Sequence, residues 1–303
     1  MVSSILLLNK PTGIRSASCV HLLRTKFPKR VKVGHGGTLD STASGLLVIL
    51  LGNATRLSDY VMMLPKEYKV TLKLGVSTST LDYSGEIVSQ SSFSHITSEK
   101  IDAILPAFQG MRMQLPPTVS AIKIQGKRAS DLKRGGCSPI LAPRPVTVSF
   151  IRRISNISKE GEISLFVRCH KGTYIRSIVR DLGEKLGCGA TVTELIRLST
   201  GTMKLESALS YQEAEQYNWE EVLNKTLSLQ DFAAHFTIYE ANTIQEENIK
   251  NGLKIRIKEM LPISRGPVPT NIAICVLGKK LFSLGTLELI ETNTFFRPRT
   301  NIF

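Results

Sequence analysis

The sequence feature that most constrains the fold is a run of six apolar residues at positions 46–51. The run is far too short to span a membrane, and it presents no polar side chain to solvent. A segment of this length and composition is typical of a central strand that is buried on both faces. The chain is therefore predicted to contain a sheet with packed layers on both sides of this strand.

A second strand is expected shortly afterwards, with a different pattern. Tyr68, Val70, Leu72 and Leu74 alternate with polar residues. This period of two predicts a strand with one face toward the core, and it places Tyr68 on the core-facing side. A third strand is expected at 163–169.

Helices are expected between the strands. Residues 18–27 are predicted to form a short helix that Pro28 ends. An apolar stripe over 175–186 predicts another, which ends at the natural C-cap Gly187. Further helices are expected over 52–64 and 97–108, and after Ser210, which forms a capping box with Glu213.

The last part of the chain, from position 236, is expected to consist mainly of short strands. Short strands are expected at 255–257, 272–277 and 281–289. We interpret 236–303 as a small all-β module.

The charge balance points to a polyanionic partner. The chain has 39 Lys and Arg against 25 Asp and Glu, a net charge of +14. Such an excess favours nucleic acid through phosphate contacts and counterion release. An anionic membrane is the competing partner, but no basic amphipathic helix is apparent that could lie on it. We therefore expect a nucleic-acid partner and no membrane association.

One long segment, 110–148, concentrates this charge. It is rich in Pro and Gly, and between its positions 123 and 144 it holds six cations and one acid, Asp131. A connection of this length inside a compact domain is usually functional or disordered. The six cations are Lys123, Lys127, Arg128, Lys133, Arg134 and Arg144.

Targeting signals and metal motifs are not evident. The apolar stretch at 5–8 is too short for a signal-peptide core. The five cysteines are scattered, odd in number and lack a Cys-x-x-Cys spacing, which argues for a reducing compartment and against a zinc site. We expect a cytoplasmic protein without a bound metal.

Asp40 is the first carboxylate in the chain, and seven cationic side chains precede it. It ends the glycine-rich segment 34–40, where backbone can approach a ligand closely. The segment is not a phosphate loop, because no Gly-Lys-Ser/Thr follows. Taken alone, an Asp in such a turn is usually structural. An anion on a cationic platform nevertheless suits a nucleophile that acts on a polyanion.

Other candidates are also ambiguous when taken singly. Tyr68 alone is most simply a core aromatic, and His35 a turn residue. Arg176 and Asp181 are spaced like a helix-surface ion pair.

Together these residues match a known family pattern. The sequence reads Leu-Asn-Lys-Pro-Thr-Gly at 8–13, Gly-His-Gly-Gly-Thr-Leu-Asp at 34–40 and Arg-Cys-His-Lys-Gly-Thr-Tyr-Ile-Arg-Ser at 168–177. With these blocks, the chain resembles the TruB-type tRNA pseudouridine synthases nearly end to end. These enzymes isomerise uridine 55 in the T-loop of tRNA. Shorter matching blocks lie at 43–47, 51–55, 66–70, 116–123, 144–146 and 181–183.

The resemblance implies a role for each matching residue. Asp40 falls on the nucleophile, and Arg176 on the arginine that pairs with it. Tyr68 falls on the tyrosine that stacks on the uracil, and His35 on the histidine that fills the space left by the flipped base. Residues that match the lining of the base pocket are Tyr174 and Leu195. Residues expected to contact RNA are Lys123, Lys127, Arg128, Lys133, Arg134 and Lys171.

The resemblance also implies an architecture. We expect an α+β catalytic domain over 1–235, with a large mixed, mainly antiparallel sheet flanked by helices. Segment 110–148 corresponds to the family's RNA-gripping thumb, and 236–303 resembles a PUA domain. The reaction is a redox-neutral isomerisation, so no cofactor is expected. The expected partner is the T-arm and T-loop of tRNA, bound by a monomer.

Two departures lie beside the nucleophile. The family usually has Thr where this chain has Gly36, and Pro where it has Ser41. Loss of the proline is expected to loosen the loop in the unbound state.

Two other functions remain open. One is a non-catalytic chaperone that binds the tRNA elbow and lets it refold. The other is a methyltransferase, although the chain lacks a Gly-rich cofactor turn within a βαβ unit. The joint presence of Asp40, Tyr68 and Arg176 favours the isomerase over binding alone.

Overall fold

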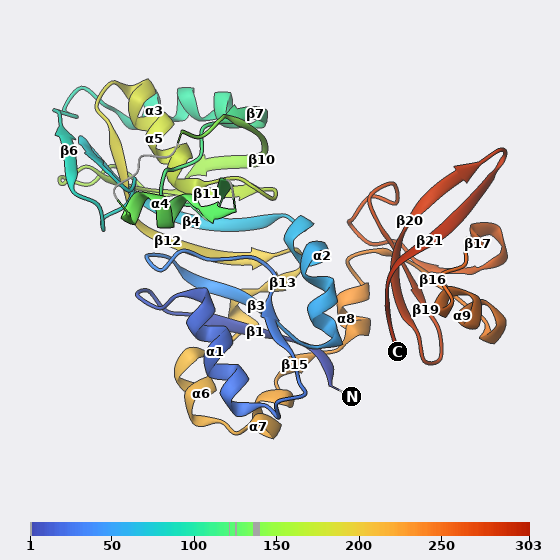
Figure 1. Cartoon of the computed structure of the whole chain (residues 1–303). Coiled ribbons are helices and arrows are strands. Elements are labelled where there is room, and N and C mark those ends of the chain that lie inside the picture. The colour runs from blue at the N-terminus through green and yellow to red at the C-terminus, as the bar shows by residue number, and fades with distance from the viewer. Residues whose placement is uncertain (1, 121, 125, 136–139) are drawn as a thin grey trace.

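The computed structural model describes residues 2–120, 122–124, 126–135 and 140–303. Within these residues the largest element is an 11-stranded sheet that runs through the centre of the molecule (Figure 1). Its main path follows the order β14 (Leu209–Ser210), β1 (Ser3–Lys10), β3 (Ser44–Gly52), β12 (Ala190–Thr200), β4 (Lys66–Leu74), β11 (Glu162–Cys169), β10 (Arg144–Arg153) and β7 (Gly110–Gln114). Three short strands join it at the side: β2 (Val33–His35), β13 (Met203–Lys204) and β15 (Thr226–Leu227).

The sheet is mixed and mainly antiparallel, as predicted. Its parallel contacts are β1 with β14 and β3 with β12. The β3–β12 contact is short and pairs Ile196 with Ser44 and Arg197 with Gly45. Gly45 has a φ of +102°, and a Cβ there would overlap the Arg197 carbonyl. Glycine at this position therefore allows the two halves of the sheet to meet.

The half formed by β1 and β3 is buried on both faces, as the apolar run predicted. Leu47 and Ile49 pack in one cluster with α1 (Ser16–Lys26), α6 (Tyr211–Gln216) and α7 (Trp219–Leu223). Leu46 and Val48 point the other way, toward α2 (Ser58–Met63) and α8 (Leu229–Ala233).

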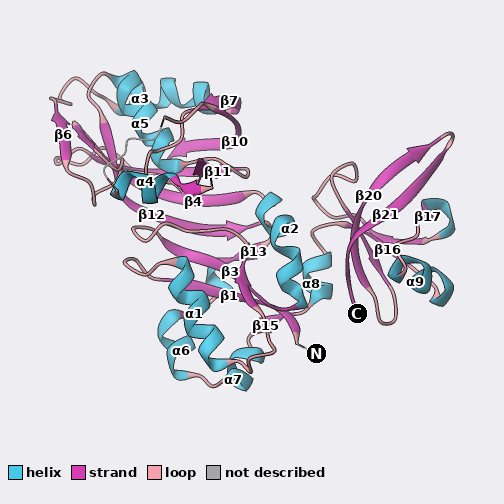
Figure 2. Cartoon of the chain, in the orientation of Figure 1, coloured by secondary structure: helices cyan, strands magenta, loops and turns pink. Residues whose placement is uncertain are grey.

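The half formed by β4, β11 and β10 is covered on one face. Val70, Leu72 and Leu74 pack in a cluster with α5 (Ile175–Leu186) and α3 (Ser98–Ile104). Tyr68 packs against the same cluster, so its predicted core-facing position is confirmed. Figure 2 shows the helices gathered on this side of β4 and β11.

The helices follow their sequence signals closely at the ends that carry a cap. Gly187 adopts the left-handed conformation (φ 75°) after α5, and Ser210 forms the predicted capping box at α6. The expected helix over 52–64 is instead a 3-10 segment, Asn53–Leu57, followed by α2. The expected helix over 97–108 likewise ends in a 3-10 segment, Leu105–Phe108.

The C-terminal module is built on a second sheet, six-stranded in the described part of the chain. Its order is β17 (Ile255–Arg256), β21 (Asn293–Ile302), β20 (Phe282–Ile290), β19 (Ile274–Leu277), β16 (Thr237–Glu240) and β18 (Leu261–Ser264). It also contains α9 (Thr243–Lys250), which the sequence analysis did not anticipate. Phe236 and Phe282 pack in the same cluster as Leu46 and Leu57, so a shared core joins the module to the first sheet. The domain boundary at 235/236 itself stays a prediction.

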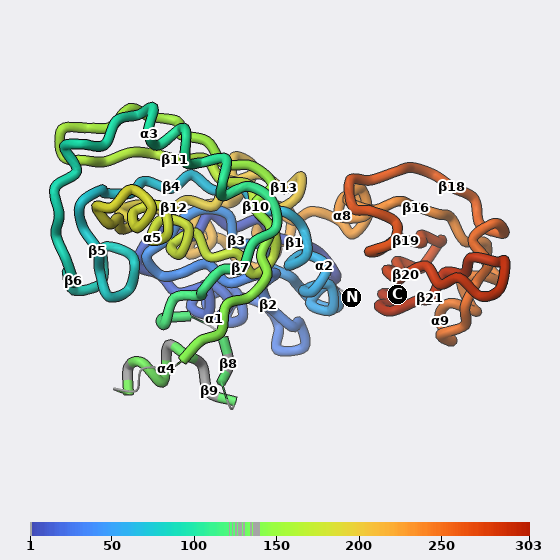
Figure 3. The backbone as a smooth tube through the Cα atoms, turned by 90° about the horizontal axis from the view of Figure 1, so that it is seen from above, coloured from blue at the N-terminus to red at the C-terminus, as the bar shows by residue number. Residues whose placement is uncertain are grey.

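Only the middle of segment 110–148 projects from the body. Its two ends are the edge strands β7 and β10 of the main sheet. Between them lie the hairpin of β8 (Lys123–Ile124) and β9 (Lys127–Arg128), followed by α4 (Ala129–Arg134). Figure 3 shows these three elements extending away from the rest of the chain.

Among the described residues, no helix combines the length and the apolar character needed to cross a membrane.

Candidate active site

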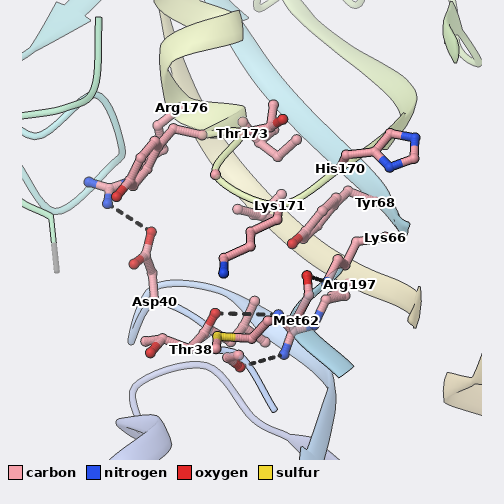
Figure 4. A pocket seen from close by; sticks show the side chains of 16 residues that line it. Thr38, Asp40, Met62, Lys66, Tyr68, His170, Lys171, Thr173, Arg176 and Arg197 are labelled. Atoms are coloured by element: carbon pink, nitrogen blue, oxygen red, sulfur yellow. Dashed lines mark hydrogen bonds and ion pairs between the residues drawn. The ribbon is translucent and has the colours of Figure 1, made fainter. Parts of the chain in front are cut away.

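A pocket of about 310 Å³ lies where the two halves of the sheet meet (Figure 4). Its walls come from the β2–β3 loop, from β4 and β12, and from the segment that leads into α5. Its side chains include Asp40, Met62, Lys66, Tyr68, His170, Lys171, Tyr174, Arg176, Leu195 and Arg197. Residues more than 150 positions apart in the sequence therefore surround one space.

Asp40 is on the β2–β3 loop, and neighbouring elements fix this loop. The Ser16 hydroxyl donates to the Leu39 carbonyl (2.7 Å) and accepts from the Leu39 amide (2.9 Å). The Gly13 amide donates to the Ser41 carbonyl at 2.7 Å. The carboxylate remains partly exposed at the mouth of the pocket.

Arg176 is in the first turn of α5, and its side chain is 4% exposed. Its Nη2 lies 2.8 Å from Asp40 Oδ2, and its Nη1 lies 3.5 Å from Asp82 Oδ2. The same two nitrogens donate to the carbonyls of Thr80 (2.9 Å) and Val119 (3.0 Å). The guanidinium is thus fixed on several sides and holds Asp40 through one of its nitrogens.

Asp82 is a buried acid that the sequence analysis missed. Besides Arg176, its carboxylate accepts hydrogen bonds from the hydroxyls of Thr80 (2.7 Å), Ser84 (2.6 Å) and Thr42 (3.1 Å). The available signal was a single acid within a run of Ser and Thr at 77–84. Arg176 therefore bridges two carboxylates, of which Asp40 is the one open to the pocket.

Two tyrosines and one leucine shape the pocket. Tyr68 lies beside Arg197 in the β4–β12 register. Tyr174 precedes α5, and the Gln114 side chain binds both its amide (2.8 Å) and its carbonyl (3.1 Å). Burial raises the pKa of Tyr68 and of Tyr174 above the usual value, so both phenols are neutral near pH 7. Leu195 adds an apolar contact surface.

Arg197 is a buried cation that the sequence analysis also missed. Its Nε donates to the Leu46 carbonyl (2.6 Å), and Nη1 and Nη2 donate to the carbonyls of Thr38 (3.3 Å) and Gly37 (3.2 Å). A register shift between Arg197 and Ser199 interrupts β12 here, and such irregularities often direct a side chain into a site. Arg197 therefore ties the loop that carries Asp40 to the sheet.

Two buried lysines hold backbone segments next to the site in place. Lys66 donates to the carbonyls of Val61, Met62 and Leu64, and burial lowers its pKa to about 7. Lys10 donates to the carbonyls of Pro11, Ile14 and Ala43, and burial lowers its pKa to about 8.

The remaining predicted residues lie around the pocket. His35 lines an adjoining hollow of about 630 Å³, which shares Asp40 and Arg176 with the first pocket. Its Nδ1 accepts a hydrogen bond from the Gly37 amide at 3.3 Å. Lys171 is exposed and points into the space between Asp40 and Tyr68 (Figure 4).

The predicted RNA contacts of the thumb are described only in part. Lys133 is exposed on α4. The side chains of Lys123, Lys127, Arg128 and Arg134 lie outside the described residues, so these contacts stay predictions.

The glycine at position 36 has a structural reason. A Cβ on Gly36 would overlap the Val61 side chain of α2. Packing in this chain therefore excludes the threonine expected at that position, and Val61 occupies the space.

No group of three or more His, Cys, Asp or Glu side chains suited to a metal ion occurs within the described residues.

Comparison with known proteins identifies the family. Residues 22–175 match the model of the TruB family pseudouridylate synthase N-terminal domain, and residues 176–235 match that of the tRNA pseudouridylate synthase B C-terminal domain. The tRNA pseudouridine synthase B of Clostridium perfringens is 38% identical over 255 residues, which cover 84% of this chain and 85% of that protein. The protein of the same name from Synechocystis is 34% identical, and the match covers 96% and 97% of the two chains.

Solved structures extend the likeness to the C-terminal module. A chain of a Cbf5-Nop10-Gar1 complex superposes with a TM-score of 0.73 and 21% identity. The superposition covers 98% of this chain and 83% of that one, and it shows a shared fold. The expected α+β architecture with a PUA-like module is thereby confirmed. The sequence matches show that this chain belongs to the TruB family of pseudouridylate synthases, which are isomerases.

Proposed function

We propose that this enzyme converts uridine 55 in the T-loop of tRNA to pseudouridine, with Asp40 as the nucleophile. The observation that carries the proposal is the contact of 2.8 Å between Asp40 and Arg176 at the mouth of a pocket lined by Tyr68 and Leu195. A carboxylate with one side held by a buried guanidinium keeps its other side free for a ligand. The relatives named tRNA pseudouridine synthase B support the substrate class.

The target uridine has to leave the base stack to enter this pocket. Extrusion costs a few kcal/mol, and the pocket offers contacts that offset this cost. Stacking on the Tyr68 ring contributes roughly 1–3 kcal/mol. His35 lies in the adjoining hollow, where it is placed to fill the space that the base leaves.

The reaction exchanges one bond for another on the same base. The C–N glycosidic bond breaks, and a C–C bond forms between C5 and C1′. C5 loses its proton, and the former glycosidic nitrogen gains one. Electrons balance within the substrate, so the chemistry requires no external oxidant or reductant. Three routes restore the free carboxylate: an Asp40–C1′ ester breaks when C5 attacks C1′, an Asp40–C6 bond breaks after C5 has bonded to C1′, or Asp40 removes the C2′ proton to form a glycal and returns it when C5 bonds to C1′.

Arg176 acts on Asp40 in two ways. Its Nη2 contacts the carboxylate at 2.8 Å, and the attraction between the two opposite charges fixes the position of the carboxylate. Its Nη1 and Nη2 also contact Asp82 and two backbone carbonyls, so the guanidinium cannot follow the carboxylate away from the pocket. Both carboxylate and cation are therefore in place before the uridine arrives.

The experiment that tests the proposal uses an unmodified tRNA transcript. The purified protein is incubated with it, and pseudouridine is mapped by carbodiimide treatment followed by reverse transcription. We expect one new stop, at position 55. A transcript with cytidine at position 55 is the matched control and is expected to give no stop. Modification elsewhere, or none at all, would refute the assignment.

The thumb and the overall assembly complete the proposal. The hairpin β8–β9 and α4 grip the T-arm, and Lys171 contacts the RNA beside the pocket. Truncating Lys127 and Arg128 is expected to weaken tRNA binding and to flatten its dependence on salt. Equal salt slopes for the two proteins would remove the thumb from the RNA contact. The monomeric state and the cytoplasmic location stay predictions.

A further inference from the structure

A second group of cations lies far from the pocket, at the end of α1 and in the connection to β2. Between positions 24 and 32 the chain has five cations and no acid. The five are Arg24, Lys26, Lys29, Arg30 and Lys32.

The cations differ in how they are used. Arg24 donates to the Val33 carbonyl (3.3 Å), and Lys26 donates to the Glu215 carbonyl (2.7 Å), so these two hold the connection in place. Lys29, Arg30 and Lys32 are exposed, and within the described residues they form no ion pair. Three charges are thus left unneutralised on one short connection.

The connection is nevertheless fixed in shape. The Val31 amide donates to the Pro28 carbonyl at 2.8 Å, and Val31 itself is buried. The Gly52 amide donates to the Lys32 carbonyl at 2.7 Å. Because the backbone is anchored at both ends, binding a partner here costs little backbone conformational entropy, and the remaining cost is that of ordering the side chains.

Two of the three cations border a hollow of about 840 Å³. Arg30 and Lys32 line one side, and Trp219 of α7 lines the other, with Asn53 also in the wall. No acid is among the lining residues. Trp219 packs edge-on against Phe27 at 6.3 Å, which fixes the indole at the rim. A cluster of unpaired cations whose surroundings contain no acid is typical of surfaces that contact nucleic-acid phosphates.

The position of the hollow relates it to the pocket. It lies at the Gly52 end of β3, whereas the Asp40 loop enters β3 at Ser44. Nine residues of strand separate the two by roughly 26 Å. Figure 3 shows the α1–β2 connection projecting from the same side of the molecule as β8, β9 and α4.

We propose that Lys29, Arg30 and Lys32, with Trp219, bind the phosphate backbone of the double-stranded RNA stem that continues from the target loop. This proposal rests on the proposed function, because it takes the loop to be in the Asp40 pocket. A stem that leaves the pocket along this face passes the hollow, and its phosphates neutralise the three charges. The contact reads no sequence. The distance between the pocket and the hollow determines how far from the loop the RNA must still be double-stranded.

The test compares two double variants that remove the same charge. Arg30→Ala with Lys32→Ala removes the proposed contact. Lys159→Ala with Lys185→Ala removes two exposed cations from the β10–β11 turn and the end of α5. Each protein is titrated with a whole tRNA transcript and with a hairpin that holds the T-loop on a stem too short to span the roughly 26 Å between the pocket and the hollow.

We expect the first variant to bind whole tRNA about 5- to 30-fold more weakly, as expected when two exposed ionic contacts are lost. The slope of log affinity against log salt decreases by about 1.5, because each lost phosphate contact removes about 0.7 to 0.9. Affinity for the short hairpin and the rate of conversion at saturating tRNA stay within twofold of the parent. The control variant stays within twofold on both RNAs.

Two results would overturn this inference. One is whole-tRNA affinity for the first variant equal to that of the control. The other is an equal loss of affinity for the hairpin and for whole tRNA. This would mean that the cations act through the long-range electrostatic field of the protein and not through contact with the stem. Failure of the proposed function is distinguishable, since the parent protein itself would then make no pseudouridine.

Discussion

The cations around the Asp40 pocket and those on the α1–β2 connection have opposite roles. Arg176, Arg197 and Lys66 are buried, and their donors are occupied by carboxylates or backbone carbonyls of the protein. Arg30 and Lys32 are exposed and unpaired within the described residues. The first group fixes geometry before a ligand arrives, whereas the second is left for the phosphates of a ligand.

The energetic consequences differ in the same way. A buried charge is stable only when it is paired, so removing its partner leaves a desolvated charge that costs several kcal/mol. An exposed cation contributes about 0–1 kcal/mol to an ionic contact. Substitutions in the cleft are therefore expected to have much larger effects than those on the connection, and the following predictions test this difference.

The largest effect is expected at Asp40, the proposed nucleophile. Asp40→Asn preserves size and most contacts but removes the negative charge. We expect pseudouridine formation to fall by about 10³-fold or more, with tRNA affinity within about threefold of the parent. A single-turnover assay and a binding titration measure the two quantities. Normal turnover by this variant would disprove the nucleophile assignment and leave the chaperone role as the better explanation.

The next effect tests the planar shape of the buried cation. Arg176→Lys keeps the positive charge but cannot contact Asp40, Asp82 and two carbonyls at once. We expect kcat to fall by about 10²- to 10³-fold. Arg180→Lys, one turn later and paired with the partly buried Asp181, is the matched control and is expected to change kcat less than threefold. Similar effects of the two substitutions would contradict the comparison.

A smaller effect is expected when the second carboxylate is altered. Asp82→Asn keeps hydrogen-bonding atoms but removes the negative charge that lies 3.5 Å from Arg176 Nη1. Misplacement of the guanidinium is expected to lower kcat by about 10- to 100-fold while KM stays within twofold. Asp102→Asn, which removes an exposed acid paired with Arg153 at 2.7 Å, is the control. A change in KM alone would show that Asp82 acts on RNA binding instead.

The last prediction concerns stability and its dependence on pH, not activity. Burial lowers the pKa of Lys66 to about 7, from 10.5 for an exposed lysine. Between these two values the unfolded chain binds more protons than the folded one, so this group makes stability rise with pH, by at most about 1.4 kcal/mol per pH unit. Below pH 7 both states are protonated and the contribution is flat.

Lys66→Met removes this titration. The free energy of unfolding of the parent relative to the variant is expected to increase from pH 7 to pH 10, as measured by urea denaturation. Lys69→Met, on the exposed face of the same strand, is expected to leave the pH dependence unchanged. A constant difference between parent and Lys66→Met would mean that the three carbonyl partners keep Lys66 charged throughout.

The parts of the fold that the sequence predicted are those with a local physical signal. β3 contains the unbroken apolar run 46–51, which is buried on both faces, whereas β4 alternates and has one face toward the core. Gly187 ends α5 because glycine adopts positive φ without strain. The break between the 3-10 segment Asn53–Leu57 and α2 was not predicted, because both parts share one apolar stripe.

Some residues of the candidate active site were identified from the sequence, and others were missed. Asp40, Tyr68 and Arg176 were found through the family resemblance, and their proximity could not be read from spacing alone. Asp82 and Arg197 were missed, since an acid in a Ser/Thr-rich turn and an arginine in a strand look ordinary without their partners.

The sequence by itself determined the kind of strands and helices, the family and the excess of positive charge, because each depends on the identity and order of neighbouring residues. The tertiary structure alone decided which cations are neutralised and which remain free. Pairing depends on contacts such as Arg176 with Asp40 across 136 positions of the chain, and on packing that buries one lysine while leaving another in solvent.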